Sequence, residues 1–152
     1  MTELKTRIQE DIKVAMRARD KERLGTLRML MAAIKQREID DREVLGEAEV
    51  IAVLDKQLKQ RREAFSQYQA AGRGDLADKE AYEIEVIQTY MPEQMSAEAL
   101  SQLIGEAIVQ TQASTVKDMG KVMARVKPKV QGRADMAAVS AEVRARLLQP
   151  SD

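Results

Sequence analysis

The order of apolar and polar residues along the chain predicts helices from one end to the other. Apolar side chains recur three or four positions apart, which places them on one face of an α-helix, and no stretch alternates with the period of two that a strand needs. Most other positions carry Ala, Gln, Glu, Lys or Arg, which favour helices. The pattern therefore predicts an all-α protein.

The apolar stripes predict seven helices, several of which begin at a good N-cap residue type. The expected helices run from Thr2 to Ala18, from Asp20 to near Ile39, from beyond Gly46 to about Ala71, from Asp75 to about Tyr90, from Ser96 to about Gln110, from Thr115 to Pro128, and from Asp135 towards Pro150. The segment Asp40–Gly46 is charged and aperiodic, so it is expected to be an exposed connection.

Pro92 is the predicted domain boundary, because proline interrupts a helix and restricts the residue before it. The sequence thus predicts a four-helix N-terminal domain over residues 1–92 and a small three-helix C-terminal domain over 93–152. Each domain is short enough to bury only a modest core. A large two-layer enzyme is therefore not expected.

The composition removes most familiar catalytic and metal sites. The chain has no cysteine and no histidine, which excludes thiolate nucleophiles, zinc fingers, iron–sulfur clusters and the commonest general base. No glycine-rich nucleotide-binding motif occurs, and no cofactor is expected. No uncharged run approaches the roughly 20 residues of a membrane span, and the first residues lack the apolar region of a signal peptide. We therefore expect a cytoplasmic protein without a membrane partner.

One acidic cluster falls on the predicted fourth helix. Its members are Asp75, Asp78, Glu80, Glu83 and Glu85. Carboxylate metal centres in helical bundles use Glu-x-x-His pairs, and this chain has no histidine. We therefore expect no metal here, and expect the carboxylates to face solvent or the basic runs 17–23 and 56–62.

Basic residues are concentrated in one part of the C-terminal domain. The whole chain has 25 basic and 25 acidic side chains, which excludes nucleic-acid binding driven by bulk charge. Residues 93–114, however, contain three acidic residues and no basic one, whereas 115–134 contain six basic residues and one acidic one. The six are Lys117, Lys121, Arg125, Lys127, Lys129 and Arg133.

An advance of about 100° per residue places Lys117, Lys121 and Arg125 along one ridge of the sixth helix, opposite its apolar stripe. The other three basic residues follow in a turn predicted from Lys127 to Arg133. All six are then expected to form one basic edge able to hold phosphates, and such binding weakens steeply with salt. The alternative is an ordinary solvated helix face.

Two glycines lie among these basic residues. Gly120 falls inside the predicted helix, where glycine costs about 1 kcal/mol relative to alanine, so a close backbone approach is expected there. Gly132 lies in the predicted turn, whose backbone N–H groups can face a phosphate, with Asp135 competing for them. We include both glycines in the candidate RNA-binding set.

Three segments resemble the YqeY family, whose members are also called GatB/YqeY-domain proteins. They are Asp20–Leu30, Tyr90–Met95, and the stretch from Asp118 to Met136 that contains Gly120-Lys-Val-Met and Gly132-Arg-Ala-Asp. The resemblance covers essentially the whole chain. It implies a helical N-terminal domain joined to a helical tail, and the tail, from about Met95 to Leu148, is similar to the tail of GatB. GatB is the tRNA-binding subunit of the glutamine-dependent Asp-tRNA/Glu-tRNA amidotransferase.

The GatB tail helps to hold tRNA, so the resemblance implies a non-catalytic accessory protein whose tail binds tRNA or a similar structured RNA. All four aromatic residues precede Pro92, so RNA contacts in the tail are expected to read backbone and shape. GatB's catalytic region and its amidase partner have no counterpart here. Carbon–nitrogen ligase (amidotransferase) activity with glutamine as amide donor would therefore rest on resemblance alone.

A protein–protein interaction adaptor with no RNA role is the alternative from a different functional class. On that interpretation the long third helix, the nine methionines and the acidic fourth helix engage a protein partner. The tail would then be only a scaffold.

Overall fold

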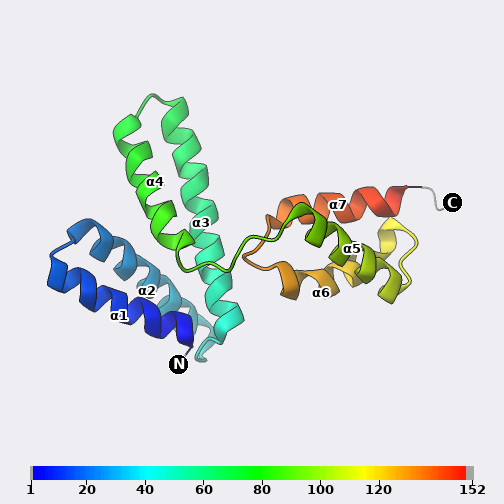
Figure 1. The fold of residues 1–152 in the computed structure, drawn as a ribbon, viewed down its shortest axis with the longest axis horizontal. Helices are drawn as coiled ribbons and strands as arrows, with labels where there is room; N and C mark the ends of the chain where they lie inside the picture. Colours follow the sequence, from blue (N-terminus) through cyan, green and yellow to red (C-terminus); the bar gives the residue numbers. More distant parts are fainter. Residues whose placement is uncertain (1, 150–152) are drawn as a thin grey trace. The chain divides into compact units, whose positions relative to one another are not determined.

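A computed structural model describes residues 2–149 and contains, within that range, seven α-helices and one short 3₁₀ turn (Figure 1). The elements are α1 (Glu3–Ala18), α2 (Lys21–Asp41), α3 (Glu47–Ala70), α4 (Gly74–Gln88), α5 (Ala97–Thr111), η1 (Val116–Asp118), α6 (Met119–Val130) and α7 (Met136–Leu148). The all-α prediction is confirmed. The predicted stop at Pro150 lies outside the described residues. The chain divides into two compact units between Met91 and Pro92.

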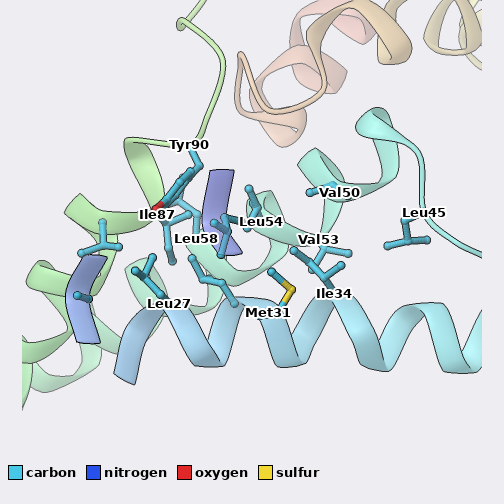
Figure 2. Close-up of a cluster of buried hydrophobic side chains, with 14 residues drawn as sticks. Leu27, Met31, Ile34, Leu45, Val50, Val53, Leu54, Leu58, Ile87 and Tyr90 are labelled. Atoms are coloured by element: carbon cyan, nitrogen blue, oxygen red, sulfur yellow. The ribbon is translucent and has the colours of Figure 1, made fainter. Parts of the chain in front are cut away.

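The N-terminal unit consists of two helix pairs, α1 with α2 and α3 with α4, packed on a common apolar core (Figures 1 and 2). The apolar stripes predicted for the four helices supply much of this core, because the same spacing that defines each stripe brings its side chains to one face. The fully buried members include Ile8, Leu27, Leu30, Ile34, Leu54 and Ile87.

Most helix ends agree with the N-cap residues predicted from the sequence. The Thr2 hydroxyl accepts a hydrogen bond from the Lys5 backbone N–H, and the Asp20 carboxylate accepts one from the N–H of Arg23. The start of α4 differs from the prediction. The N-cap position is held by Arg73, and Asp75 lies inside the first turn, where a hydrogen bond from Arg73 lowers the pKa of its carboxyl group.

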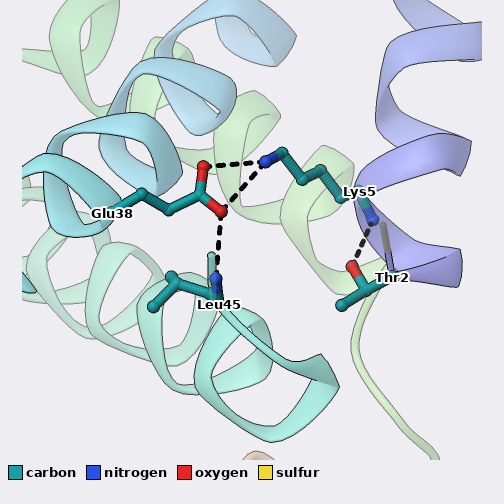
Figure 3. Close-up of polar contacts among 4 residues, drawn as sticks. All are labelled: Thr2, Lys5, Glu38 and Leu45. Carbon is teal, nitrogen blue, oxygen red and sulfur yellow. Dashed lines mark hydrogen bonds and ion pairs between the residues drawn. The ribbon is translucent and has the colours of Figure 1, made fainter. Parts of the chain in front are cut away.

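The α2–α3 connection corrects the sequence prediction of a wholly exposed segment. Leu45 is only 2% exposed and packs in the core, whereas its neighbour Val44 is 72% exposed. The cause is visible in Figure 3: Glu38 accepts the Leu45 backbone N–H at 3.0 Å and pairs with the Lys5 ammonium at 2.7 Å. The charged residues of the connection remain in water while this anchor turns the single leucine inwards.

The acidic helix α4 contributes one buried ion pair to the N-terminal unit. Glu83 accepts a hydrogen bond from Arg61 at 2.8 Å, and both side chains are less than a tenth exposed. Arg61 belongs to the basic run 56–62, so Glu83 faces this run as the sequence suggested. Gln57 accepts from the same guanidinium with its side-chain and backbone oxygens.

The C-terminal unit packs α5, α6 and α7 around a second core (Figure 1). Its buried residues are Ile104, Ala107, Val122, Val126, Val130, Val139, Val143 and Leu147. The predicted N-caps Ser96 and Asp135 are confirmed, since each side chain accepts a backbone N–H of the helix that follows. Arg146 of α7 donates to the backbone oxygen and the hydroxyl of Ser101 on α5, which ties these two helices together.

None of the described helices combines the length and the apolar composition that crossing a membrane requires.

Candidate nucleic-acid interface

Helix α6 carries most of the predicted basic edge and is longer than the sequence indicated. The sequence predicted a stop at Pro128 and a turn from Lys127 to Arg133, but α6 continues to Val130 with Pro128 inside its last turn. A proline removes only its own N–H, and near a helix end few further hydrogen bonds are lost. Lys127 and Lys129 therefore lie on the helix and not in a turn.

Because Lys127 and Lys129 are helical, the six predicted basic residues do not all lie on one edge. Lys121, Arg125 and Lys129 follow one another at intervals of four residues, so they form a single ridge, and Lys117 precedes them in η1. Lys127 lies two residues from Lys129 and so faces the other side of α6, about 160° away. We call Lys121, Arg125 and Lys129 the basic ridge.

The basic ridge lies beside α5, as its contacts show. Arg125 donates to the side-chain oxygen of Gln110 at 2.9 Å, and Lys129 lines a surface hollow together with residues of α5. Within residues 92–149, no carboxylate reaches ion-pair distance of Lys117, Arg125, Lys127, Lys129 or Arg133. Five of the six predicted cations therefore form no ion pair with the described residues of their own unit.

Among these six residues, Lys121 alone forms an ion pair within the described part of the unit. Its ammonium lies 3.8 Å from Asp118, and the lysine side chain is 70% exposed, so this is a weak surface pair. Asp118 serves mainly the backbone: its carboxylate accepts the N–H groups of Ser114 and Thr115, which lower the pKa of the Asp118 carboxyl group. The predicted Thr115–Asp118 capping box is present.

The surroundings of the two candidate glycines differ from what the sequence suggested, and their place in an RNA-binding set stays a prediction. A Cβ added to Gly120 would meet nothing within 4 Å, so no close approach within the described chain requires glycine there. Gly132 is buried and has a φ of +76°, a left-handed conformation that glycine adopts without strain. The N–H groups of Arg133 and Ala134 both donate to the Val130 oxygen. These two N–H groups are therefore not available to a phosphate.

Arg133 is the most firmly positioned of the six basic residues. Its Nε donates to the Glu93 backbone oxygen at 2.9 Å, and its own carbonyl accepts the Met95 N–H at 2.8 Å. Gln94 donates to the neighbouring Gly132 oxygen, so the segment 93–95 holds the α6–α7 turn in place. The terminal amino groups of Arg133 keep no partner among the described residues, and they remain able to bind an anion.

A surface hollow of about 480 Å³ adjoins Arg133 and contains residues that the sequence analysis missed. Its lining comprises Lys129 and Arg133 together with Met95, Ala99, Gln102, Leu103 and Glu106. The last five lie on α5 or just before it, in the segment 93–114, which the sequence marked only by its three acidic residues and its lack of basic ones. Only the position of α6 beside α5 brings the two sets together, and no pattern along the sequence encodes that contact.

No group of three or more carboxylates suited to a metal ion occurs among residues 2–149. Among the acidic residues of α4, Glu83 pairs with Arg61.

Comparison with known families decides the classification. The model of the family described as Yqey-like protein matches residues 5–147. The chain belongs to the YqeY family. The match spans both compact units, so the similarity to the family is not confined to the C-terminal unit.

Several relatives that match this chain carry the name altered inheritance of mitochondria protein 41, mitochondrial. The protein from Eremothecium gossypii is 37% identical over 91 residues, 59% of this chain and 50% of that protein. The one from Vanderwaltozyma polyspora is 35% identical over 85 residues, 55% and 46% respectively. The one from Pyrenophora tritici-repentis is 28% identical over 130 residues, 84% and 71%.

The chain spans about half the length of the first two of these relatives. Their names state a mitochondrial location and no molecular activity. They therefore give no support to the cytoplasmic location predicted above, which stays a prediction for this chain.

Proposed function

We propose that this protein is a non-catalytic accessory protein that binds tRNA or a similarly structured RNA through its C-terminal unit. Lys117, Arg133 and the basic ridge contact the phosphate backbone. The observation that carries the proposal is that, among residues 92–149, no carboxylate lies within ion-pair distance of these cations, Lys121 excepted. Exposed lysines and arginines that neutralise phosphates release counterions, which supplies binding energy without sequence recognition.

Two further observations support the proposal. Arg133 is fixed by backbone contacts before any ligand arrives, so little side-chain entropy is lost when it binds an anion. The tail also resembles the tRNA-holding tail of GatB, as the sequence indicated. Lys127 is not part of the proposed surface, because it faces the other side of α6.

The direct test is an equilibrium binding assay of the full chain with labelled tRNA. A variant with Lys121→Glu, Arg125→Glu and Lys129→Glu reverses the charge of the basic ridge. The matched control reverses three exposed cations of the N-terminal unit, Lys21, Arg28 and Lys56. Both variants carry the same net charge, so bulk electrostatics changes equally in both.

We expect the ridge variant to lose at least about tenfold in affinity, since each lost phosphate contact weakens binding to every sequence. We expect the control variant to retain most of its affinity. Helix content measured by circular dichroism must be unchanged in both variants. Equal losses in both, or no binding by the unaltered chain, would remove the proposal.

The second candidate function is a protein-interaction adaptor, and one surface of the N-terminal unit favours it. Ile39 and Val44 are 69% and 72% exposed and line a hollow of about 430 Å³ at the α2–α3 connection. Exposed apolar side chains that lie together often mark contact surfaces. Partners that co-purify after nuclease digestion, and are lost with Ile39→Asp, would favour this function over RNA binding.

A further inference from the structure

The hollow beside Arg133 is lined by side chains of three kinds. Met95, Ala99 and Leu103 are its apolar residues, which we call the floor. Lys129 and Arg133 are its cationic residues, which we call the cationic wall, and Gln102 and Glu106 supply an amide and a carboxylate. A volume of about 480 Å³ falls within the range of small-ligand sites.

The cationic wall is prepared for a phosphate. The contact of Nε with the Glu93 oxygen fixes the Arg133 guanidinium, and its two terminal amino groups stay free within the described residues. Lys129 is exposed and forms no ion pair with the carboxylates of residues 92–149. A planar guanidinium beside an ammonium is a common arrangement for binding phosphate oxygens.

Glu106 supplies hydrogen-bond acceptors to the same hollow. Gln102 donates one side-chain N–H to Glu106 at 3.2 Å, which holds the carboxylate in place on the surface of α5. An ionised carboxylate only accepts hydrogen bonds. A ligand group that faces Glu106 must therefore present N–H or O–H donors, and a carbonyl oxygen there would be repelled.

We propose that this hollow holds one unpaired nucleotide of the bound RNA, with its phosphate at Lys129 and Arg133 and an amino-bearing base edge at Glu106. The inference rests on the proposed function and adds base selectivity to it. The guanine Watson–Crick edge has adjacent N–H donors and cytosine has an amino group, whereas uracil presents carbonyl oxygens on either side of its one N–H. The aliphatic floor replaces the aromatic platform that this unit lacks.

The experiment titrates the full chain with GMP, CMP and UMP at low salt and follows backbone amide signals by NMR. We expect saturable shifts at residues 99–106 and 129–134 with GMP and CMP. Binding of UMP should be at least about fivefold weaker, because one base-edge hydrogen bond discriminates by that order. Inorganic phosphate serves as the probe for the cationic wall alone.

Two variants test the contributions of Glu106 and of the cationic wall separately. Glu106→Gln should abolish the preference for GMP over UMP and preserve phosphate binding, while Glu98→Gln, an exposed change on the same helix, should leave the preference intact. Lys129→Gln should weaken all three nucleotides together. Each pattern differs from that of a folding defect, which would move amide signals throughout the unit before any ligand is added.

Equal affinities for the three nucleotides, or a preference unchanged by Glu106→Gln, would overturn the nucleotide site. Persisting tRNA binding in that case would leave the proposed function standing. Base-selective mononucleotide binding by a chain that does not bind tRNA would contradict the proposed function and support the selectivity of the hollow.

Discussion

Glu38 joins three parts of the N-terminal unit through one carboxylate. It pairs with Lys5 of α1, accepts the Leu45 N–H of the connection, and itself belongs to α2 (Figure 3). The hydrogen bond from Lys5, followed by that from Leu45, lowers the pKa of Glu38 below its ordinary value of 4.5. The residue therefore links the stability of this unit to pH.

The pKa of Glu38 is lower in the folded protein than in the unfolded chain. Glu38 therefore stabilises the folded state fully at pH values above its pKa in the unfolded chain, and this stabilisation is lost as the pH falls through its pKa in the folded protein. We expect Glu38→Gln to be less stable than the unaltered chain near neutral pH. We also expect it to lose less stability on acidification. Near-ultraviolet circular dichroism of tyrosine measures this selectively, since every aromatic residue precedes Pro92. Parallel pH profiles of the two proteins would contradict this role.

The buried pair of Arg61 and Glu83 gives a second residue-scale prediction. Arg61→Met leaves the Glu83 carboxylate buried without its partner, so the free energy of unfolding should fall by about 3–5 kcal/mol. Adding Glu83→Leu should restore much of this loss, because the second change removes the stranded charge. Urea denaturation of both variants measures the effect. Arg62→Met, at an exposed neighbouring position, is the control and should change little.

The sequence predicted the burial of some residues but not the contacts that they make. The pattern placed Tyr90 on an apolar stripe, and the residue is indeed buried. Its hydroxyl also donates to Asp11 at 2.5 Å, and the Arg7 guanidinium lies 4.7 Å from the centre of its ring. Both partners are about 80 positions away in the chain, so no local spacing could reveal them.

At the scale of single elements, the α2–α3 connection contains two adjacent apolar residues, one buried and one exposed, whose substitution should affect stability differently. Leu45→Ala should lower the free energy of unfolding by about 2–5 kcal/mol, because Leu45 is buried in the core. Val44→Ala should change it by less than about 0.5 kcal/mol, because Val44 is exposed. Chemical denaturation followed by tyrosine signals measures both. Similar effects of the two substitutions would contradict the inward position of Leu45.

Most elements themselves could be predicted, because helix periodicity and N-cap residues are local properties. Ser96 and Asp135 begin their helices as expected. The errors arose where tertiary contacts override local preference. Leu45 packs in the core where Glu38 anchors its backbone, and α6 continues through Pro128 to Val130, which is buried in the core of the tail.

At the scale of the whole molecule, charge is balanced overall but unevenly distributed. The sequence revealed the basic segment, and the structure divides it into the basic ridge, a lysine on the other side of α6, and the fixed Arg133. The chain's membership of the YqeY family covers both units. The central claim is that the positive charge of the tail serves to bind a polyanion.

The dependence of tRNA affinity on salt tests this claim most directly. We predict that the logarithm of the binding constant falls linearly with the logarithm of salt concentration, with a slope of about −3.5 to −4.5, as expected for five phosphate contacts. Reversing the charges of the basic ridge should make the slope less steep by about 2 to 3, because three of the five contacts are lost. An affinity that does not change with salt, or the same slope in both proteins, would contradict the claim.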